Sequence, residues 1–152
     1  MLNSKFDYKA CVANADDFYE IGCLVDKKLF KIDMDGLSYR YASVFAVNVS
    51  FACELYLKAL IENKRSTPPF THKQKELFSK LQEVDKNLAG KIEKEFNDIH
   101  PSSPLERVLE VNDNSFNDFR YLHESAFKKK AIHSTGLVAL ANILKDSCHE
   151  LL

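Results

Sequence analysis

The stretch that most constrains this chain is residues 41–61, where almost every side chain is apolar. At helical pitch the polar side chains Ser50, Glu54 and Lys58 fall four residues apart, on one narrow stripe. The other directions are apolar, which is typical of a helix packed on most sides. The charge-free part ends at Cys53, well short of the roughly 20 residues that cross a bilayer. We therefore expect the central core helix of a bundle and no membrane span.

Two polar side chains of this expected helix, Asn48 and Glu54, fall where burial is predicted. A buried amide or carboxylate persists only when it is paired or hydrogen-bonded. These two side chains are therefore the first candidates for a functional site.

Length and composition predict one domain over residues 1–152, long enough to bury a core without disulfides or a metal. Glycine and proline number four each, tryptophan is absent and 28% of the residues are charged, which favours long helices over a turn-rich β architecture. The net charge of -1 gives no global attraction to nucleic acid, so such binding would need a local patch.

The amino terminus shows no apolar segment preceded by basic residues, so we expect no signal peptide and a cytoplasmic protein. The four cysteines agree with a reducing compartment, because they are scattered singly, with no Cys-x-x-Cys pair and no histidine pair at zinc spacing. We expect reduced, structural thiols and no metal site. The cysteines are Cys11, Cys23, Cys53 and Cys148.

Helical periodicity runs through nearly the whole chain. Apolar residues recur at i, i+3, i+4 and i+7 from Tyr8 to Leu29 and predict a long first helix. Breaks are expected at residues 33–36, at the proline-containing residues 64–70 and at residues 100–104. After the central helix we expect a third helix from residue 71 or 72, a fourth capped by Asp85 and a short turn of helix over 105–111. A last helix, after the less periodic segment 125–134, carries apolar residues from Leu137 to Leu151 on one face. With no alternating strand pattern, the predicted fold is all-α, an antiparallel up-and-down bundle of four to five main helices.

The segment 116–124 is short, aromatic and rich in ionisable groups. Arg120, His123 and Glu124 lie three and four residues apart, so one helical face can carry all three. The plain interpretation is an exposed salt bridge between Arg120 and Glu124. The flanking aromatic residues favour partial burial instead, and a partly buried arginine needs a carboxylate or phosphate partner. Glu54 is the candidate partner; such a pair either staples two helices or, if open to solvent, leaves Arg120 to bind a phosphate.

Two further groups could contribute chemistry. His72 stands after the Pro-Pro loop, where a cap or a solvent-facing residue is the plain interpretation, although histidine suits proton transfer near neutral pH. Lys128 begins a run of three lysines, which is either a solvated face or a phosphate-backbone contact beside Arg120. A Gly-rich phosphate loop, a G-x-S-x-G motif, a zinc helix motif and the paired aspartates of two-metal nucleases are missing, so we predict no metal and no cofactor.

Residues 48–60, 72–78 and 116–124 together resemble HEPN domains, in the branch whose late motif reads Phe, then Arg-Tyr, then Glu. The resemblance covers most of the chain and depends on the order and spacing of short motifs. It implies an antiparallel helical bundle, usually dimeric, of the kind found in bacterial toxin-antitoxin and antiphage systems, where many members are metal-independent RNases. In the nucleolytic members an arginine, followed after four to six residues by a histidine, meets its copy at a dimer cleft, near a polar residue of an earlier helix.

Carried over to this chain, the resemblance makes Arg120 the motif arginine. The motif histidine would fall within residues 125–127, which contain none. His123 comes too early and His133 too late. The resemblance therefore implies that Arg120 holds phosphate, with His123 or His72 as alternative groups for proton transfer. Asn48 or Glu54 matches the earlier polar residue.

We therefore predict a HEPN-like RNA-binding protein, with metal-independent ribonuclease activity of a toxin or antiphage type if it cleaves RNA. The alternatives are a non-catalytic helical interaction module and a nucleotide-binding subunit paired with a nucleotidyltransferase. Expected partners are RNA or a nucleotide, a second copy of the chain, and an antitoxin or nucleotidyltransferase, without a membrane. The candidate catalytic residues are Arg120, His123, Glu54 and His72, and the candidate binding residues are Asn48, Lys58, Tyr121, Glu124 and Lys128.

Overall fold

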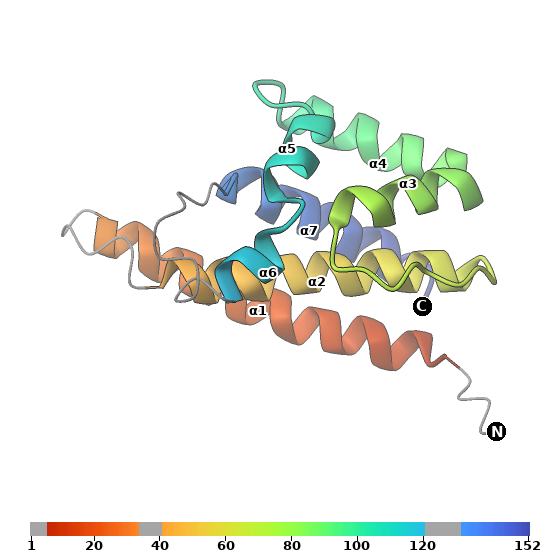
Figure 1. The fold of residues 1–152 in the computed structure, drawn as a ribbon, viewed down its shortest axis with the longest axis horizontal. Helices are drawn as coiled ribbons and strands as arrows, with labels where there is room; N and C mark the ends of the chain where they lie inside the picture. Colours follow the sequence, from red (N-terminus) through yellow and green to blue (C-terminus); the bar gives the residue numbers. More distant parts are fainter. Residues whose placement is uncertain (1–5, 34–40, 121–131) are drawn as a thin grey trace.

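The computed structural model describes residues 6–33, 41–120 and 132–152, and within these ranges every regular element is an α-helix (Figure 1). The predicted all-α bundle is confirmed, with five main helices and two short ones in the described ranges. The helices are α1 (Tyr8–Asp33), α2 (Ala42–Asn63), α3 (Gln74–Val84), α4 (Lys86–Ile99), α5 (Leu105–Asn112), α6 (Ser115–Arg120) and α7 (Ser134–His149).

Helix α2 is the centre of the bundle, as its composition predicts. It packs against α1, α3, α6 and α7, so its apolar residues meet other helices on most sides. By length and composition α2 could cross a membrane, yet 67% of its most apolar window is buried inside the protein. The fully buried side chains of α2 include Val49, Cys53, Tyr56, Leu57 and Leu60.

Helix α3 begins at Gln74, two or three residues later than the sequence predicts. Lys73, the residue before it, has an extended backbone, and its N–H donates to Thr71 Oγ1 at 3.1 Å. This side-chain hydrogen bond competes with helix formation, as threonine commonly does at helix starts. The delay leaves His72 in the loop instead of in the first helical turn.

The contact between α1 and α2 is closest at Gly22. A Cβ added to Gly22 would overlap Val49 Cγ2 and lie 3.4 Å from the Val49 backbone nitrogen. Val49 is fully buried and β-branched, so its side chain has little freedom to move away. The absence of a side chain at Gly22 therefore sets how closely α1 approaches the central helix.

Asp85 fastens three helices together. Its carboxylate accepts a hydrogen bond from the Leu88 N–H at 3.1 Å, so the predicted cap of α4 is confirmed. The same carboxylate forms an ion pair of 2.8 Å with Lys64 at the end of α2. Together the hydrogen bond from Lys64 and that from Leu88 lower the pKa of Asp85.

All four cysteines are free, and Cys53 and Cys148 are fully buried. Burial raises the pKa of the Cys148 thiol to about 12 and that of Cys11 to about 11. Thiols held in their protonated form are poor nucleophiles, which agrees with the structural role predicted for these cysteines.

We expect Gly22→Ala to lower the free energy of unfolding by about 1–3 kcal/mol, because the added methyl overpacks a rigid contact. Gly90→Ala is the matched control, since Gly90 lies within α4 with nothing within 4 Å of the added Cβ. This control should stabilise the protein by about 0.5–1 kcal/mol through helix propensity. Urea denaturation followed by circular dichroism measures both. Stabilisation by both variants would contradict the close packing of α1 on α2.

A second prediction concerns the charge of Asp85. Asp85→Asn keeps a capping side chain but removes the charge that pairs with Lys64. Because the pKa of Asp85 is lower in the folded state, its charge stabilises the fold above the unfolded-state pKa of about 3.9, and this stabilisation is lost as the pH falls through the folded-state pKa. We expect the variant to lose about 0.2–1 kcal/mol near neutral pH and to match the wild type in strong acid. Thermal unfolding of both proteins from neutral pH to strong acid is the measurement. A difference in stability between the variant and the wild type that does not change with pH would contradict the prediction.

Candidate functional site

A buried carboxylate lies at the middle of the central helix. Glu54 is 2% exposed, and both of its oxygens have partners. Lys58 Nζ donates to Oε1 at 2.7 Å, and His72 Nδ1 lies 2.8 Å from Oε2. The Lys58 side chain is 20% exposed and that of His72 is 41% exposed. The cluster therefore leads from the core of the bundle to its surface. Glu54 is buried and paired, as expected, although its partners are Lys58 and His72.

The loop between α2 and α3 brings His72 to this carboxylate. Helix α2 ends at Asn63, and Arg65 then adopts a left-handed φ of 57°. Pro68 and Pro69 keep the following chain out of a helix, and the Thr71 N–H donates to the Pro69 carbonyl oxygen at 2.9 Å. His72 then faces Glu54 at the start of α3. Because the carboxylate oxygen accepts, Nδ1 carries the hydrogen, and Nε2 is the acceptor atom of the neutral ring. This arrangement orients an imidazole whose second nitrogen can take up a proton.

Helix α6 supplies an aromatic ring and an arginine to the same place. The Phe116 ring stacks on the His72 ring, with centroids 4.6 Å apart and planes inclined by 30°. Four residues later, Arg120 Cζ lies 5.5 Å from the centroid of Phe116, which is a cation–π contact. The partly buried Phe51 of α2 packs against Phe116, with ring centroids 5.2 Å apart. Phe116 is therefore the link between the histidine and the arginine.

The predicted direct pair between Arg120 and Glu54 requires a correction. The two oxygens of Glu54 are taken by Lys58 and His72, and Arg120 is exposed at the end of α6. Arg120 joins the cluster through the face of Phe116 instead. The predicted buried ion pair between Arg120 and Glu54, which would have joined two helices, is therefore not formed. The i, i+4 spacing of Phe116 and Arg120 was the sequence signal for the observed contact.

The remaining predicted site residues have separate outcomes. Asn48 is partly exposed, and its Nδ2 donates to the Val44 carbonyl oxygen at 2.7 Å within α2, so its amide is engaged by its own helix. Lys58 contacts Glu54, as described above. Four predicted residues fall outside the described ranges: Tyr121, His123, Glu124 and Lys128.

Buried polar side chains concentrate at the junction of α2, the start of α3 and α6. Four of the six buried polar residues of the described ranges belong to these elements: Ser50, Glu54, Gln74 and Ser115. Gln74 Nε2 donates to the Ser50 carbonyl oxygen at 3.5 Å, which ties α3 to α2 beside the histidine. This junction is therefore more polar than the apolar core around it.

His133, the first histidine after the motif window, has a structural role. Its Nδ1 accepts a hydrogen bond from the Gly136 N–H at 3.1 Å and caps α7. Its backbone N–H donates to Asn112 Oδ1 at 2.9 Å, and the Asn112 amide donates to the His133 carbonyl oxygen at 3.3 Å. His133 is therefore held as a helix cap.

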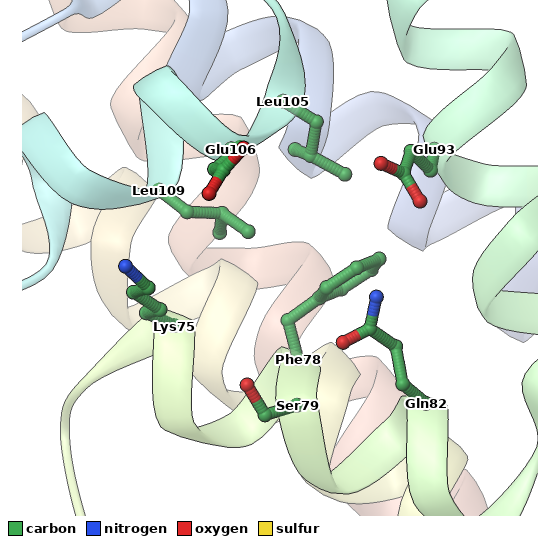
Figure 2. A pocket seen from close by; sticks show the side chains of 8 residues that line it. All are labelled: Lys75, Phe78, Ser79, Gln82, Glu93, Leu105, Glu106 and Leu109. Carbon is green, nitrogen blue, oxygen red and sulfur yellow. The ribbon is translucent and has the colours of Figure 1, made fainter.

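A cavity of about 280 Å³ lies between α3, α4 and α5, and none of the predicted site residues lines it. Figure 2 shows Phe78, Leu105 and Leu109 around its apolar centre, with Glu93 and Gln82 facing one another at one end. Its charged lining residues are Lys75, Glu93 and Glu106, which give a net negative charge. A phosphate is disfavoured here, so we place the candidate site at the Glu54–His72–Phe116–Arg120 cluster.

These features define an all-helical protein in which a carboxylate of the central helix orients a histidine, and an arginine lies beside them on a shared aromatic ring. The family model described as HEPN domain matches residues 36–145, and the chain belongs to the HEPN family. The match includes all four residues of the cluster and confirms the predicted membership of the HEPN family. A comparison with curated proteins and one with solved structures gave no match.

The burial of Glu54 leads to a stability prediction. Glu54→Ala should lower the free energy of unfolding by about 2–4 kcal/mol, because it removes a buried, doubly paired carboxylate and leaves Lys58 partly buried without it. Asp98→Ala is the matched control, since Lys94 and Asp98 form an i, i+4 ion pair of 2.6 Å on the exposed side of α4. The control should show no measurable change. Equal effects of the two variants in urea denaturation would contradict the structural role of Glu54.

Proposed function

We propose that this chain is an RNA-binding HEPN protein whose binding centre is the cluster of Glu54, His72, Phe116 and Arg120. The observation that supports this most directly is the position of Arg120. The Arg120 guanidinium is exposed at the protein surface, and it lies over the buried ring of Phe116, which orients it. A guanidinium has five N–H donors in a planar fork, which suits a phosphate oxygen pair.

The same cluster supports metal-independent RNA cleavage as the reaction. His72 Nε2 would take the proton of the ribose 2′-hydroxyl, and the 2′-oxygen would attack the adjacent phosphorus. The bond from phosphorus to the 5′-oxygen breaks, the 5′-oxygen leaves with a proton from the histidine, and a 2′,3′-cyclic phosphate forms. Glu54 keeps Nδ1 protonated and the ring oriented, and Arg120 stabilises the charge that develops on the phosphate.

The family supplies the setting of this proposal. The resemblance to HEPN domains implies a homodimer, in which two Arg120 side chains would share a cleft, and a cytoplasmic toxin or antiphage role. An antitoxin or nucleotidyltransferase partner belongs to the same proposal. A nucleotide, which presents the same phosphate chemistry, is the alternative ligand of the cluster.

RNA binding is tested by fluorescence anisotropy with labelled RNA at low salt in the presence of a chelator. Arg120→Ala should weaken binding about 10-fold or more, since a charge-assisted contact to phosphate is lost. Arg107→Ala is the matched control, because Arg107 is an exposed arginine on α5 paired with Glu110 at 3.3 Å. If the RNA is cut, His72→Ala should abolish the cyclic-phosphate product. Equal binding by the Arg120 and Arg107 variants would contradict the proposed centre.

A further inference from the structure

The loop between α2 and α3 carries an exposed aromatic side chain close to the cluster. Phe70 is fully exposed, with a relative exposure of 105%, whereas Phe116 of the cluster is 7% exposed. A single exposed apolar residue is common on protein surfaces and needs no explanation by itself. The way in which the loop holds Phe70, and the charges around it, distinguish this residue.

The loop presents Phe70 on a restrained backbone. Pro68 and Pro69 precede it, and each proline fixes its own φ angle. The Thr71 N–H donates to the Pro69 carbonyl oxygen across Phe70, and His72 is anchored on Glu54. Two residues of extended chain span at most about 7 Å, so Phe70 stays beside the cluster. The Cα atom of Phe70 therefore lies within about 7 Å of that of His72, and the exposed ring projects from this restrained backbone.

The charge of this loop differs from that of the protein. The chain has a net charge of -1, yet the loop between α2 and α3, residues 64–73, contains three lysine or arginine residues and no aspartate or glutamate. Of these, Lys64 pairs with Asp85. Arg65 and Lys73 are exposed and form no ion pair within the described part of the chain. Arg65 precedes Phe70 by five residues and Lys73 follows it by three, so these cations lie on both sides of the exposed ring along the chain.

An exposed aromatic ring between cations is the arrangement that binds single-stranded nucleic acid. Bases stack on the ring, and the cations follow the phosphate backbone. A docking surface for a protein would need further apolar side chains around the ring. The neighbours of Phe70 in the loop are instead threonine, proline, serine and basic residues. The composition of the loop favours RNA over a protein partner.

We infer that Phe70 is a stacking platform for an unpaired base of single-stranded RNA, with Arg65 and Lys73 contacting its backbone. The inference rests on the proposed function and specifies its substrate class. A nucleotide whose phosphate is held by Arg120 and His72 would place a neighbouring base on Phe70. A base in the interior of a duplex is stacked on both faces, so it cannot lie on this ring without leaving its stack.

The chain has no tryptophan, so Phe70→Trp introduces a single fluorescent indole at the tip of the loop. Titration of this full-length variant with a short single-stranded RNA should quench the indole, whereas the blunt duplex of the same sequence should not. Phe70→Ala should weaken single-strand binding about 10-fold, as loss of one stacked base does. Leu24→Ala, which truncates a 60% exposed apolar side chain on α1, is the control and should bind like the wild type.

The outcomes separate the inference from the proposed function. If Arg120→Ala loses RNA binding while Phe70→Ala binds like the wild type, the stacking role is wrong and the proposed function stands. If the wild type binds neither single strands nor duplex at low salt, the proposed function fails and the stacking role with it. Indole quenching that rises with protein concentration alone would show that a second copy covers Phe70, which would also overturn the inference.

Discussion

The structure depends on one buried charge. Glu54 sits in the middle of the most apolar helix, where an unpaired carboxylate would be very costly. Its partners are therefore necessary parts of the fold, and one of them comes from outside the helix. Pairing with His72 fixes where the chain lies after the proline loop and before α3. An interior requirement thus determines the position of a surface residue.

From this carboxylate a series of contacts leads outwards. Glu54 holds His72, the imidazole stacks on Phe116, and Phe116 carries the guanidinium of Arg120. Each contact limits the rotamers of the next side chain, so the outermost group loses less freedom when a ligand binds. The ionisable groups come from α2, from the loop before α3 and from α6, which are well separated in sequence and meet only because α2 is central.

The sequence was sufficient to predict the fold but only part of the site. Apolar periodicity identified the helices. The capping role of Asp85 could be predicted because a cap involves only a side chain and a backbone N–H three residues later. The partner of Glu54 could not be predicted in this way. Arg120 was the partner that we expected, and His72 takes its place because the loop at residues 64–73 crosses α2 there. The delayed start of α3 decides it, because His72 outside the helix can turn towards Glu54.

The ionised side chains of α2 have a consequence beyond the site. This helix meets the length and composition of a membrane-crossing segment, and Glu54 and Lys58 lie within it. A charged side chain near the centre of such a segment opposes insertion into a bilayer by about 3 kcal/mol. Glu54, the carboxylate that orders the histidine, therefore also makes this apolar segment unfavourable in a bilayer.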